Sequence, residues 1–258
     1  MGAVLQSNVY SIQAVKIGQS PSWNVSMISP VLRSDVGKEM PLPFPIWVIK
    51  SKDETILVDT GIDTSVTDPM PIGKSVYGVV ESLAEAGVEA SKITKVIVTH
   101  MHIDHFTGYT KFPNAIFYIQ RTELDHYLGP NNQNKYLTGG LPMRAVQDTI
   151  ALLRHGRVKV LEGDEELFPG VKVMLAGGHS PGLQMISVET EKGTAVLASD
   201  NAYLYHNIRE NVPVGWYYHL GQSVEALELC RKTASSPDLI IPGHDYALWG
   251  DKRLVDVV

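Results

Sequence analysis

Apolar and polar residues alternate near the start of the chain, where Tyr10, Ile12 and Ala14 are separated by Ser11 and Gln13. A period of two is typical of a strand with one buried face. This segment therefore predicts a half-buried strand.

The pattern is lost over residues 19–45, which are rich in serine and proline and show no steady period. We expect a long loop there. Loops of this length within a domain are commonly functional, and scattered apolar residues such as Trp23 and Met40 favour a loop that faces the substrate.

Short apolar runs and segments of helical period follow one another along the rest of the chain. Apolar residues three or four positions apart predict helices at residues 76–84, 122–127, 144–154 and 221–234. Apolar runs predict strands at residues 46–49, 56–58, 96–98, 115–119, 158–161, 171–175, 183–188, 194–198 and 239–241, the first two forming a hairpin. Residues 129–140 predict an exposed loop. Because both halves place strands before a helix, we expect a layered α/β fold arranged as a pseudo-symmetric sandwich.

The composition narrows the classes of protein. With 258 residues and 44% hydrophobic residues, the chain can form one large domain over residues 1–258. A formal net charge of −6 argues against nucleic acid as a partner and favours a small-molecule substrate. The single Cys230 excludes an internal disulfide framework, and its spacing predicts a helical core position.

The chain shows neither a secretory signal nor a long apolar segment. Its start lacks the basic and apolar regions of a leader, and no window approaches the ~18 apolar residues of a membrane span. We therefore expect a cytoplasmic protein without a membrane partner. The sequence leaves open whether two copies of the chain form a homodimer.

The most specific chemistry lies in the run His100-Met101-His102-Ile103-Asp104-His105, directly after the apolar residues 96–98. Three imidazoles and a carboxylate supply neutral nitrogen and anionic oxygen, a donor set that suits zinc and related transition ions better than magnesium or calcium. The run therefore predicts a metal site.

Three further candidate ligands follow apolar runs in the same way, namely His179, Asp200 and His244. Strand ends that gather at one rim of a sheet bring together side chains distant in sequence, and rigid strands hold them to the tolerance that a metal needs. A lone histidine or aspartate after a strand is more often a structural residue. Four such segments in one chain favour a shared metal site.

With these residues, the chain resembles the metallo-β-lactamase-fold hydrolases. The resemblance rests on the His100 to His105 run, Gly178-His179-Ser180-Pro181-Gly182, Asp200, Gly243-His244 and the upstream Asp59-Thr60-Gly61, in the order of the family. It implies a four-layer αββα sandwich with two metals on its rim. One metal would be bound by His100, His102 and His179, and the other by Asp104, His105 and His244. Asp200 would bridge them, and Asp59 would orient ligand imidazoles.

Within the family, Asp200-Asn201-Ala202-Tyr203 resembles the D-x-x-Y segment of the N-acyl-homoserine lactonase branch. The resemblance implies that the Tyr203 hydroxyl stabilises the developing oxyanion of a lactone carbonyl. The plain alternative for Tyr203 is an aromatic packing residue. One departure is Leu183, where many lactonases carry a second histidine after Pro181-Gly182.

The expected function is therefore hydrolysis of a lactone ring, with an N-acyl-homoserine lactone as substrate and quorum quenching as the consequence. The resemblance implies attack by a metal-bridging hydroxide, with Asp104 carrying the proton to the leaving oxygen. Zinc is the expected ion in both positions, and iron, manganese and cobalt are the alternatives.

Two alternatives remain from the sequence. One is a different ester or thioester hydrolase of this fold, similar to glyoxalase II, which is disfavoured because few basic residues lie near the motifs. The other is an iron-dependent redox enzyme. It is disfavoured because all seven candidate ligands are present and the chain has no room for the additional flavin-binding domain that some of these enzymes need. His126, His155, His206 and His219 follow no such pattern and are expected at the surface or with ordinary partners inside.

Overall fold

The inner strands of this protein carry apolar side chains on both faces. In β10 (Gln184–Thr190), Ile186 and Val188 pack into one hydrophobic cluster, while Met185, which directly precedes Ile186, packs into another. Because successive side chains of a strand point to opposite faces, such a strand needs cover on both sides. The fold supplies this cover with a second sheet on one face and helices on the other.

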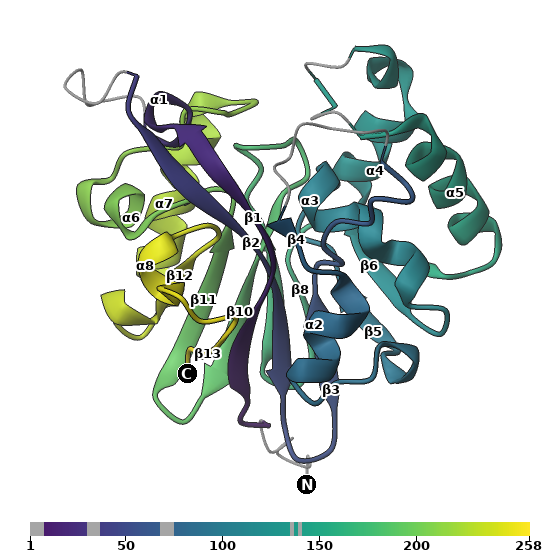
Figure 1. Ribbon diagram of the computed structural model, residues 1–258, viewed down its shortest axis with the longest axis horizontal. Coiled ribbons are helices and arrows are strands. Elements are labelled where there is room, and N and C mark those ends of the chain that lie inside the picture. Colours follow the sequence, from purple (N-terminus) through teal and green to yellow (C-terminus); the bar gives the residue numbers. More distant parts are fainter. Residues whose placement is uncertain (1–7, 30–36, 68–74, 135–136, 139–140) are drawn as a thin grey trace, which may run out of the picture.

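Two sheets lie next to each other between two groups of helices in the computed structural model, which describes residues 8–29, 37–67, 75–134, 137–138 and 141–258 (Figure 1). The larger sheet has eight strands in the order β13 (Leu254–Asp256), β1 (Ser11–Asn24), β2 (Glu39–Lys50), β3 (Thr55–Val58), β5 (Lys95–Ile97), β6 (Ile116–Gln120) and β7 (Val158–Leu161), with β4 (Ser75–Val76) paired to β1. The other has five strands, in the order β12 (Ile240–Pro242), β11 (Gly193–Ser199), β10, β9 (Val171–Leu175) and β8 (Glu165–Phe168).

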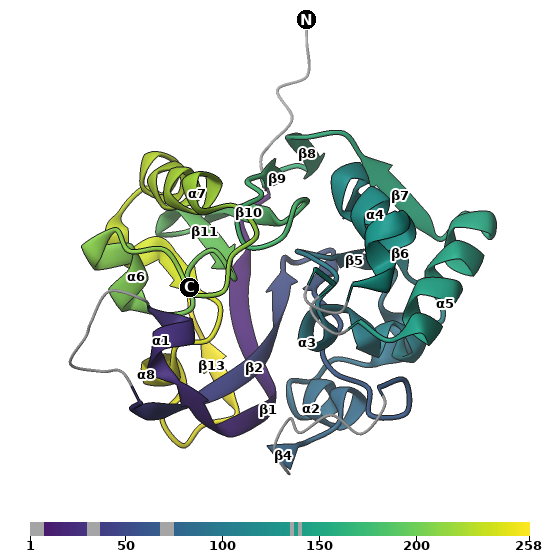
Figure 2. The same ribbon diagram turned by 90° about the horizontal axis from the view of Figure 1, so that it is seen from above.

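Helices cover the outer faces of both sheets, as the view from above shows (Figure 2). The group beside the larger sheet is α2 (Val79–Glu85), α3 (Ile103–Phe106), α4 (Arg121–Leu128) and α5 (Met143–Arg154). The helices beside the smaller sheet are α6 (Tyr205–Glu210) and α7 (Leu220–Thr233), whereas α1 (Val25–Ile28) and α8 (Tyr246–Trp249), on the same side of the molecule, contact β1, β2 and β13 of the larger sheet. Short 3₁₀ turns lie at Ala90–Lys92, Thr107–Lys111, Pro130–Gln133 and Pro237–Leu239.

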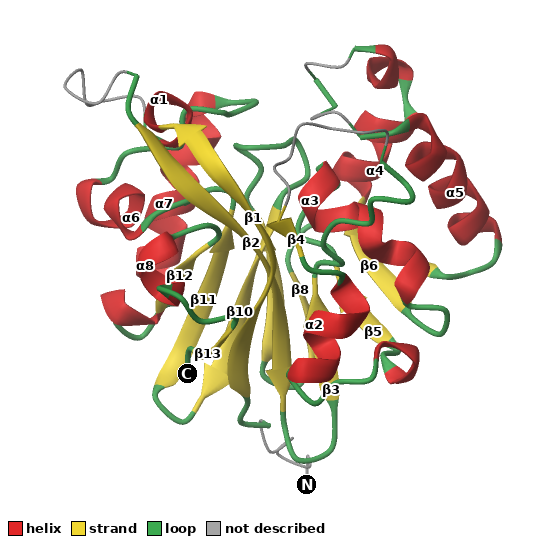
Figure 3. Ribbon diagram, in the orientation of Figure 1, coloured by secondary structure: helices red, strands yellow, loops and turns green. Residues whose placement is uncertain are grey.

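The fold has four layers of secondary structure, with red helices outside the yellow strands in Figure 3. Three apolar layers lie between them. One lies between the larger sheet and its helices, one between the sheets, and one between the smaller sheet and α7. Cys230 is fully buried in the third layer, as predicted. The expected four-layer αββα sandwich is confirmed. None of the described helices combines the length and the apolar character needed to cross a bilayer.

The expectation of a loop over residues 19–45 is wrong for the residues that the structure describes. β1 continues to Asn24 and pairs with β2 from Glu39 onward, with partners such as Gln19 with Pro43 and Trp23 with Met40. β3 pairs only with residues 47–50 of β2, so no strand among the described residues pairs with the earlier part of that edge of β2. Proline at alternate positions 41, 43 and 45 suits this free edge, because proline has no N–H to donate. The prolines and a bulge hid the strand pattern.

Smaller differences concern element boundaries. Val76 belongs to β4 instead of the helix expected from residue 76, and the predicted loop at 129–140 contains the turn Pro130–Gln133, with residues 135–136 and 139–140 outside the described part. β8 and β13 are edge strands in which no residue is fully buried, so neither gives an apolar run. The other predicted helices and strands are present within a few residues of their expected bounds.

Candidate metal centre

The topology brings the predicted ligands to one edge of the two sheets. β3 and β5 are parallel, so their carboxyl ends, which lead to Asp59 and His100, lie at the same edge. In the smaller sheet β11 and β12 are parallel, and β9 runs in the same direction two strands away. The residues that follow these three strands therefore meet at one edge, and they include the other predicted ligands His179, Asp200 and His244.

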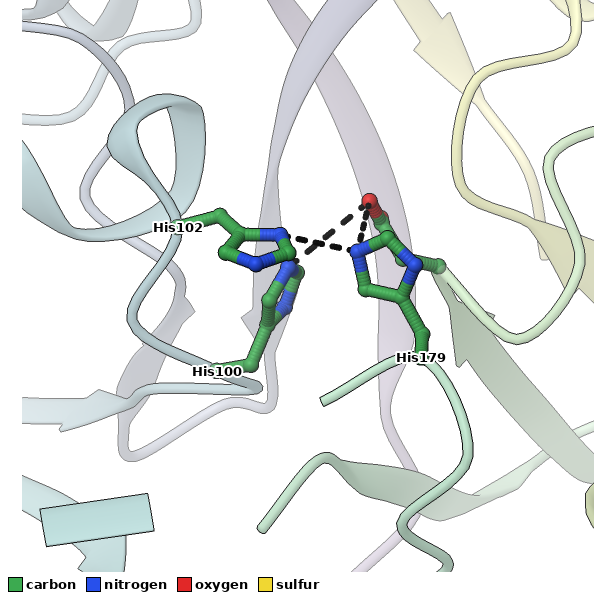
Figure 4. Close-up of side chains that lie close together, drawn as sticks. His100, His102 and His179 are labelled. Carbon is green, nitrogen blue, oxygen red and sulfur yellow. Dashed lines mark hydrogen bonds and ion pairs between the residues drawn. The ribbon is translucent and has the colours of Figure 1, made fainter. Parts of the chain in front are cut away.

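The first cluster consists of His100, His102, His179 and Asp200, whose ligand atoms all lie within 4.8 Å of one another. The three imidazoles point toward one another (Figure 4). Nδ1 of His102 lies 2.8 Å from Nε2 of His179, and Nε2 of His179 lies 3.3 Å from Oδ2 of Asp200. All four residues are buried.

The second cluster consists of Asp104, His105 and His244, again within 4.8 Å. Asp200 lies between the two clusters. Its Oδ1 faces Nε2 of His105 at 3.1 Å and Nε2 of His244 at 3.0 Å, whereas its Oδ2 faces His179 and His100. One carboxylate therefore presents a separate oxygen to each cluster.

Four of the five imidazoles are oriented through their Nδ1 atoms. His179 donates to the backbone oxygen of Trp216 and His244 to that of Pro43, both over 2.7 Å. His105 donates to Asp59 over 2.8 Å, and His100 lies 3.1 Å from the Thr99 hydroxyl. With Nδ1 used in this way, Nε2 is the ring nitrogen that faces the centre.

Asp59 holds the HxHxDH segment as well as His105. It is buried, and its carboxylate also accepts hydrogen bonds from the backbone N–H and the hydroxyl of Thr99, at 2.7 and 2.8 Å. Its backbone adopts a φ of 62°, a left-handed value that is uncommon outside glycine and costs about 1–3 kcal/mol. The sharp exit from β3 turns the carboxylate toward the ligands.

The histidines of the first cluster are held neutral. Burial, followed by the nearby His179, lowers the pKa of His102 to about 3. Burial also lowers the pKa of His100 well below its ordinary value, assisted by His105, and lowers that of His179. Neutral imidazoles are the form that binds metals, so these three are available as ligands at neutral pH.

The second cluster is more charged. Burial opposes the charged form of His105, but the carboxylates of Asp200, Asp104 and Asp59 raise its pKa well above the ordinary value. Burial likewise opposes ionisation of Asp200, yet His105 and His244 hold its pKa well below the usual range. These groups therefore concentrate negative charge beside imidazoles, which favours a bound cation.

Two buried nitrogens test whether the residues fit metal ions. Nε2 of His100 and Nε2 of His105 are shielded from solvent and make no well-aligned hydrogen bond within the described part of the chain, although both face carboxylate oxygens of Asp200. Buried polar atoms without partners are rare and costly. Both point into a set of nitrogen and carboxylate donors of the kind that binds divalent transition ions, so the site fits such ions.

A narrow cavity of about 60 Å³ opens beside the two clusters. Its polar lining comes from the metal-site side and includes Asp104 and Tyr203; its apolar lining is Trp23, Leu42, Phe44, Ile103 and Trp216. The segment at 19–45 therefore does line the site, as expected, although it does so as strands. Tyr203 is buried beside Asp200.

The remaining histidines lie outside both clusters, as predicted. His126 is buried with Nε2 2.6 Å from the backbone oxygen of Leu137, and His155 and His219 are exposed. His206 is half-buried on α6. Sequence reasoning missed Pro43 and Glu123, because a backbone carbonyl leaves no trace in residue identity and a glutamate in the first turn of a helix is ordinary.

Residues 42–244 match the sequence profile of the metallo-beta-lactamase superfamily. This chain belongs to that superfamily. N-acyl homoserine lactonase AiiA of Bacillus thuringiensis subsp. kurstaki is 30% identical over 191 residues, which cover 69% of this chain and 71% of the relative. N-acyl homoserine lactonase AttM of Azorhizobium caulinodans is 24% identical over 233 residues, covering 83% and 86%.

Solved structures give the same picture of the fold. A quorum-quenching N-acyl homoserine lactone lactonase aligns with a TM-score of 0.75 and 25% identity over 94% of each chain. The similarity therefore extends over both sheets and both groups of helices.

Proposed function

We propose that this protein is a dinuclear-metal hydrolase that opens the ring of N-acyl-homoserine lactones. The observation that carries the proposal is that both oxygens of Asp200 face histidines of separate clusters, while Tyr203 and Asp104 line the cavity beside them. The similarity to N-acyl homoserine lactonases supports the choice of substrate.

The proposal assigns one ion to His100, His102 and His179 and a second to Asp104, His105 and His244, with Asp200 shared. Zinc suits this mixed set of nitrogen and carboxylate donors, and iron, manganese or cobalt are the alternatives. Bound divalent ions lower the pKa of coordinated water and polarise a carbonyl oxygen.

Tyr203 acts as a hydrogen-bond donor to the carbonyl oxygen of the lactone. Burial, followed by the charges of Asp200 and Asp104, raises the pKa of its hydroxyl well above the ordinary value, so the hydroxyl keeps its proton. A protonated donor beside the reacting carbonyl stabilises the charge that develops on its oxygen.

Asp104 moves the proton. Burial opposes its charged form, but His105 and His244 hold its pKa below the ordinary value, so it is a carboxylate before reaction. It lies at the cavity, where it can accept a proton from the attacking water and pass it to the ring oxygen as that oxygen leaves.

The lining of the cavity favours lactones over thioesters of anionic conjugates. Among the described residues that line it, none is a lysine or an arginine, whereas six are apolar or aromatic. Such a wall suits an acyl chain and offers no counter-charge to an anionic group.

The same proposal includes a single domain over residues 1–258 and a cytoplasmic location, in keeping with one buried free thiol. It also includes a homodimer, which sedimentation tests.

A panel of acyl-homoserine lactones, other lactones and a thioester, run with metal analysis of the same sample, tests the function. Ring opening with about two ions per chain supports it. Thioester cleavage without ring opening would favour the glyoxalase II-like alternative.

A further inference from the structure

Glu123 is a buried acid that belongs to neither ligand cluster. It lies in the first turn of α4 with its side chain fully buried. Its carboxylate accepts three hydrogen bonds of 2.8 Å each: Oε1 from the backbone N–H of Met101, and Oε2 from the Ser180 hydroxyl and the backbone N–H of Gly182.

These three donors come from the two segments that carry the three imidazoles of the first cluster. Met101 lies between His100 and His102, and Ser180 follows His179 directly. The carboxylate therefore joins the segments whose imidazoles approach to 2.8 Å, between Nδ1 of His102 and Nε2 of His179.

The backbone of the second segment also packs directly on the start of α4. A Cβ placed on Gly182 would lie 2.3 Å from the backbone nitrogen of Glu123 and 2.5 Å from its Cβ. Contacts this short are not sterically allowed, so only glycine lets the segment come close enough for its N–H to reach the carboxylate.

We propose that Glu123 is a positioning residue of the metal centre, whose carboxylate sets the separation of the His102 and His179 imidazoles and so determines the affinity for the ion bound by the first cluster. The inference rests on the proposed two-ion centre and goes beyond it, since Glu123 itself contacts no ligand atom of that centre.

The chemistry of the side chain explains why a carboxylate is required. Both oxygens of a carboxylate accept hydrogen bonds, so it satisfies donors from both segments at once. An amide has one accepting oxygen, and its NH₂ group would face an N–H or a hydroxyl instead. Burial raises the pKa of Glu123 to about 7 against the opposing effect of the three donors.

The contacts predict an effect on one ion and not on the other. In the second cluster, His105 is held by Asp59 and His244 by the backbone oxygen of Pro43, with no contact from Glu123 among the described residues. Loss of the Glu123 carboxylate should therefore lower the affinity for the first ion only. Loss of the Asp59 carboxylate, which holds His105 directly and His100 only through Thr99, should lower the affinity for the second ion more than for the first.

The experiment compares Glu123→Gln with Asp59→Asn. Each full-length protein is loaded with cobalt, whose absorption reports its ligands, and the cobalt is withdrawn by a competing chelator. His102→Ala and His244→Ala supply the spectra of proteins that lack one ligand of either cluster. Asp125→Asn, an exposed acid on the same helix, is the matched control and should behave as wild type.

We expect Glu123→Gln to lower the affinity for the first ion about 10–100-fold, as loss of a group that orients ligands typically does, and to leave the second ion unchanged. Asp59→Asn should give the reverse order of metal loss. Equal weakening of both ions, together with a lower unfolding midpoint of the metal-free protein, would mean that Glu123 only supports the fold. Unchanged affinities would also overturn the proposal.

A milder variant covers the case in which Glu123→Gln does not fold. Ser180→Ala removes one of the three hydrogen bonds and should lower the affinity for the first ion alone, by less than Glu123→Gln does. Weaker binding of both ions, or of neither, counts against the proposal. These measurements use no substrate. A wild-type protein that opens no lactone would therefore overturn the proposed function, while the role of Glu123 would still be judged by metal affinity.

Discussion

The carboxylate of Asp59 and the imidazole of His105 are joined by a buried hydrogen bond of 2.8 Å between Oδ2 and Nδ1. The same carboxylate binds the backbone and side chain of Thr99. Asp59→Ala would leave all three donors buried without a partner, and we expect a loss of about 3 kcal/mol in the free energy of unfolding of the metal-free protein. Urea unfolding measures this loss. Asp53→Ala, an exposed acid, is the control and should lie within about 0.5 kcal/mol of wild type.

Tyr203→Phe separates catalysis from metal binding. Removing the hydroxyl takes away a donor to the developing oxyanion but none of the candidate ligands, so kcat should fall about 10²-fold while metal content stays at the wild-type value. Steady-state kinetics with metal analysis checks both. An unchanged kcat would leave Tyr203 as a packing residue.

His102→Ala should remove activity together with metal. The imidazole approaches His179 within the first cluster, and its loss leaves three of four donors there. We expect a loss of bound ion measured by elemental analysis, with the described fold retained by circular dichroism. His155→Ala, on an exposed histidine at the end of α5, is the matched control. Full metal content in the His102 variant would contradict the ligand assignment.

Gly108→Ala tests how closely the segment at Thr60 packs on the segment that follows the ligands. A Cβ on Gly108 would lie 2.0 Å from the backbone oxygen of Thr60, so the two backbones must separate. We expect a loss of about 1–3 kcal/mol, measured by thermal or urea unfolding. Gly221→Ala lies at the exposed start of α7 and should be neutral or slightly stabilising, since alanine favours helix. Equal stability of the two variants would refute the close packing.

Stability should depend on pH through Asp63. Burial opposes its charged form, but hydrogen bonds from Thr110, Lys111 and Ser65 lower its pKa from the ordinary 3.8 to about 2. The folded state therefore favours the carboxylate, and the stabilisation is present above pH 3.8 and is lost as the pH falls toward 2. Because Lys111 is partly exposed, we expect the Asp63 carboxylate to stabilise the folded state by about 1 kcal/mol.

The check compares wild type with Asp63→Asn in the metal-free state. The difference in unfolding free energy between them should be constant at neutral pH and shrink on acidification through the range below pH 3.8. A difference that is the same at acid and neutral pH would show that the charge of Asp63 contributes nothing.

The sequence predicts most of the fold because buried strands and amphipathic helices leave a strong period. The strand that ends before His100 and the helix that carries Cys230 are examples. The strand is a continuous apolar run, and the helix repeats apolar residues every three or four positions. β1 and β2 escaped prediction where they run beyond the sheet as a ribbon. There, prolines and exposed positions replace the alternation that one buried face would impose.

The candidate ligands could also be named from the sequence, because histidines and aspartates directly after apolar runs mark strand ends. Their partners could not. The backbone oxygen of Trp216, which orients His179, and the carboxylate of Glu123, which joins two segments, act through distances that depend on tertiary packing. Residue identity alone carries no record of such contacts.

The β1–β2 ribbon links two properties that are usually engineered separately. Leu42 and Phe44 line the cavity, and the backbone oxygen of Pro43 between them orients His244. Under the proposed function, one three-residue stretch of β2 would therefore contribute to both substrate preference and ion retention. A graft of this stretch from another lactonase, intended to change acyl-chain preference, would also shift the metal requirement, so selection for a new substrate has to be carried out at a fixed and stated metal concentration.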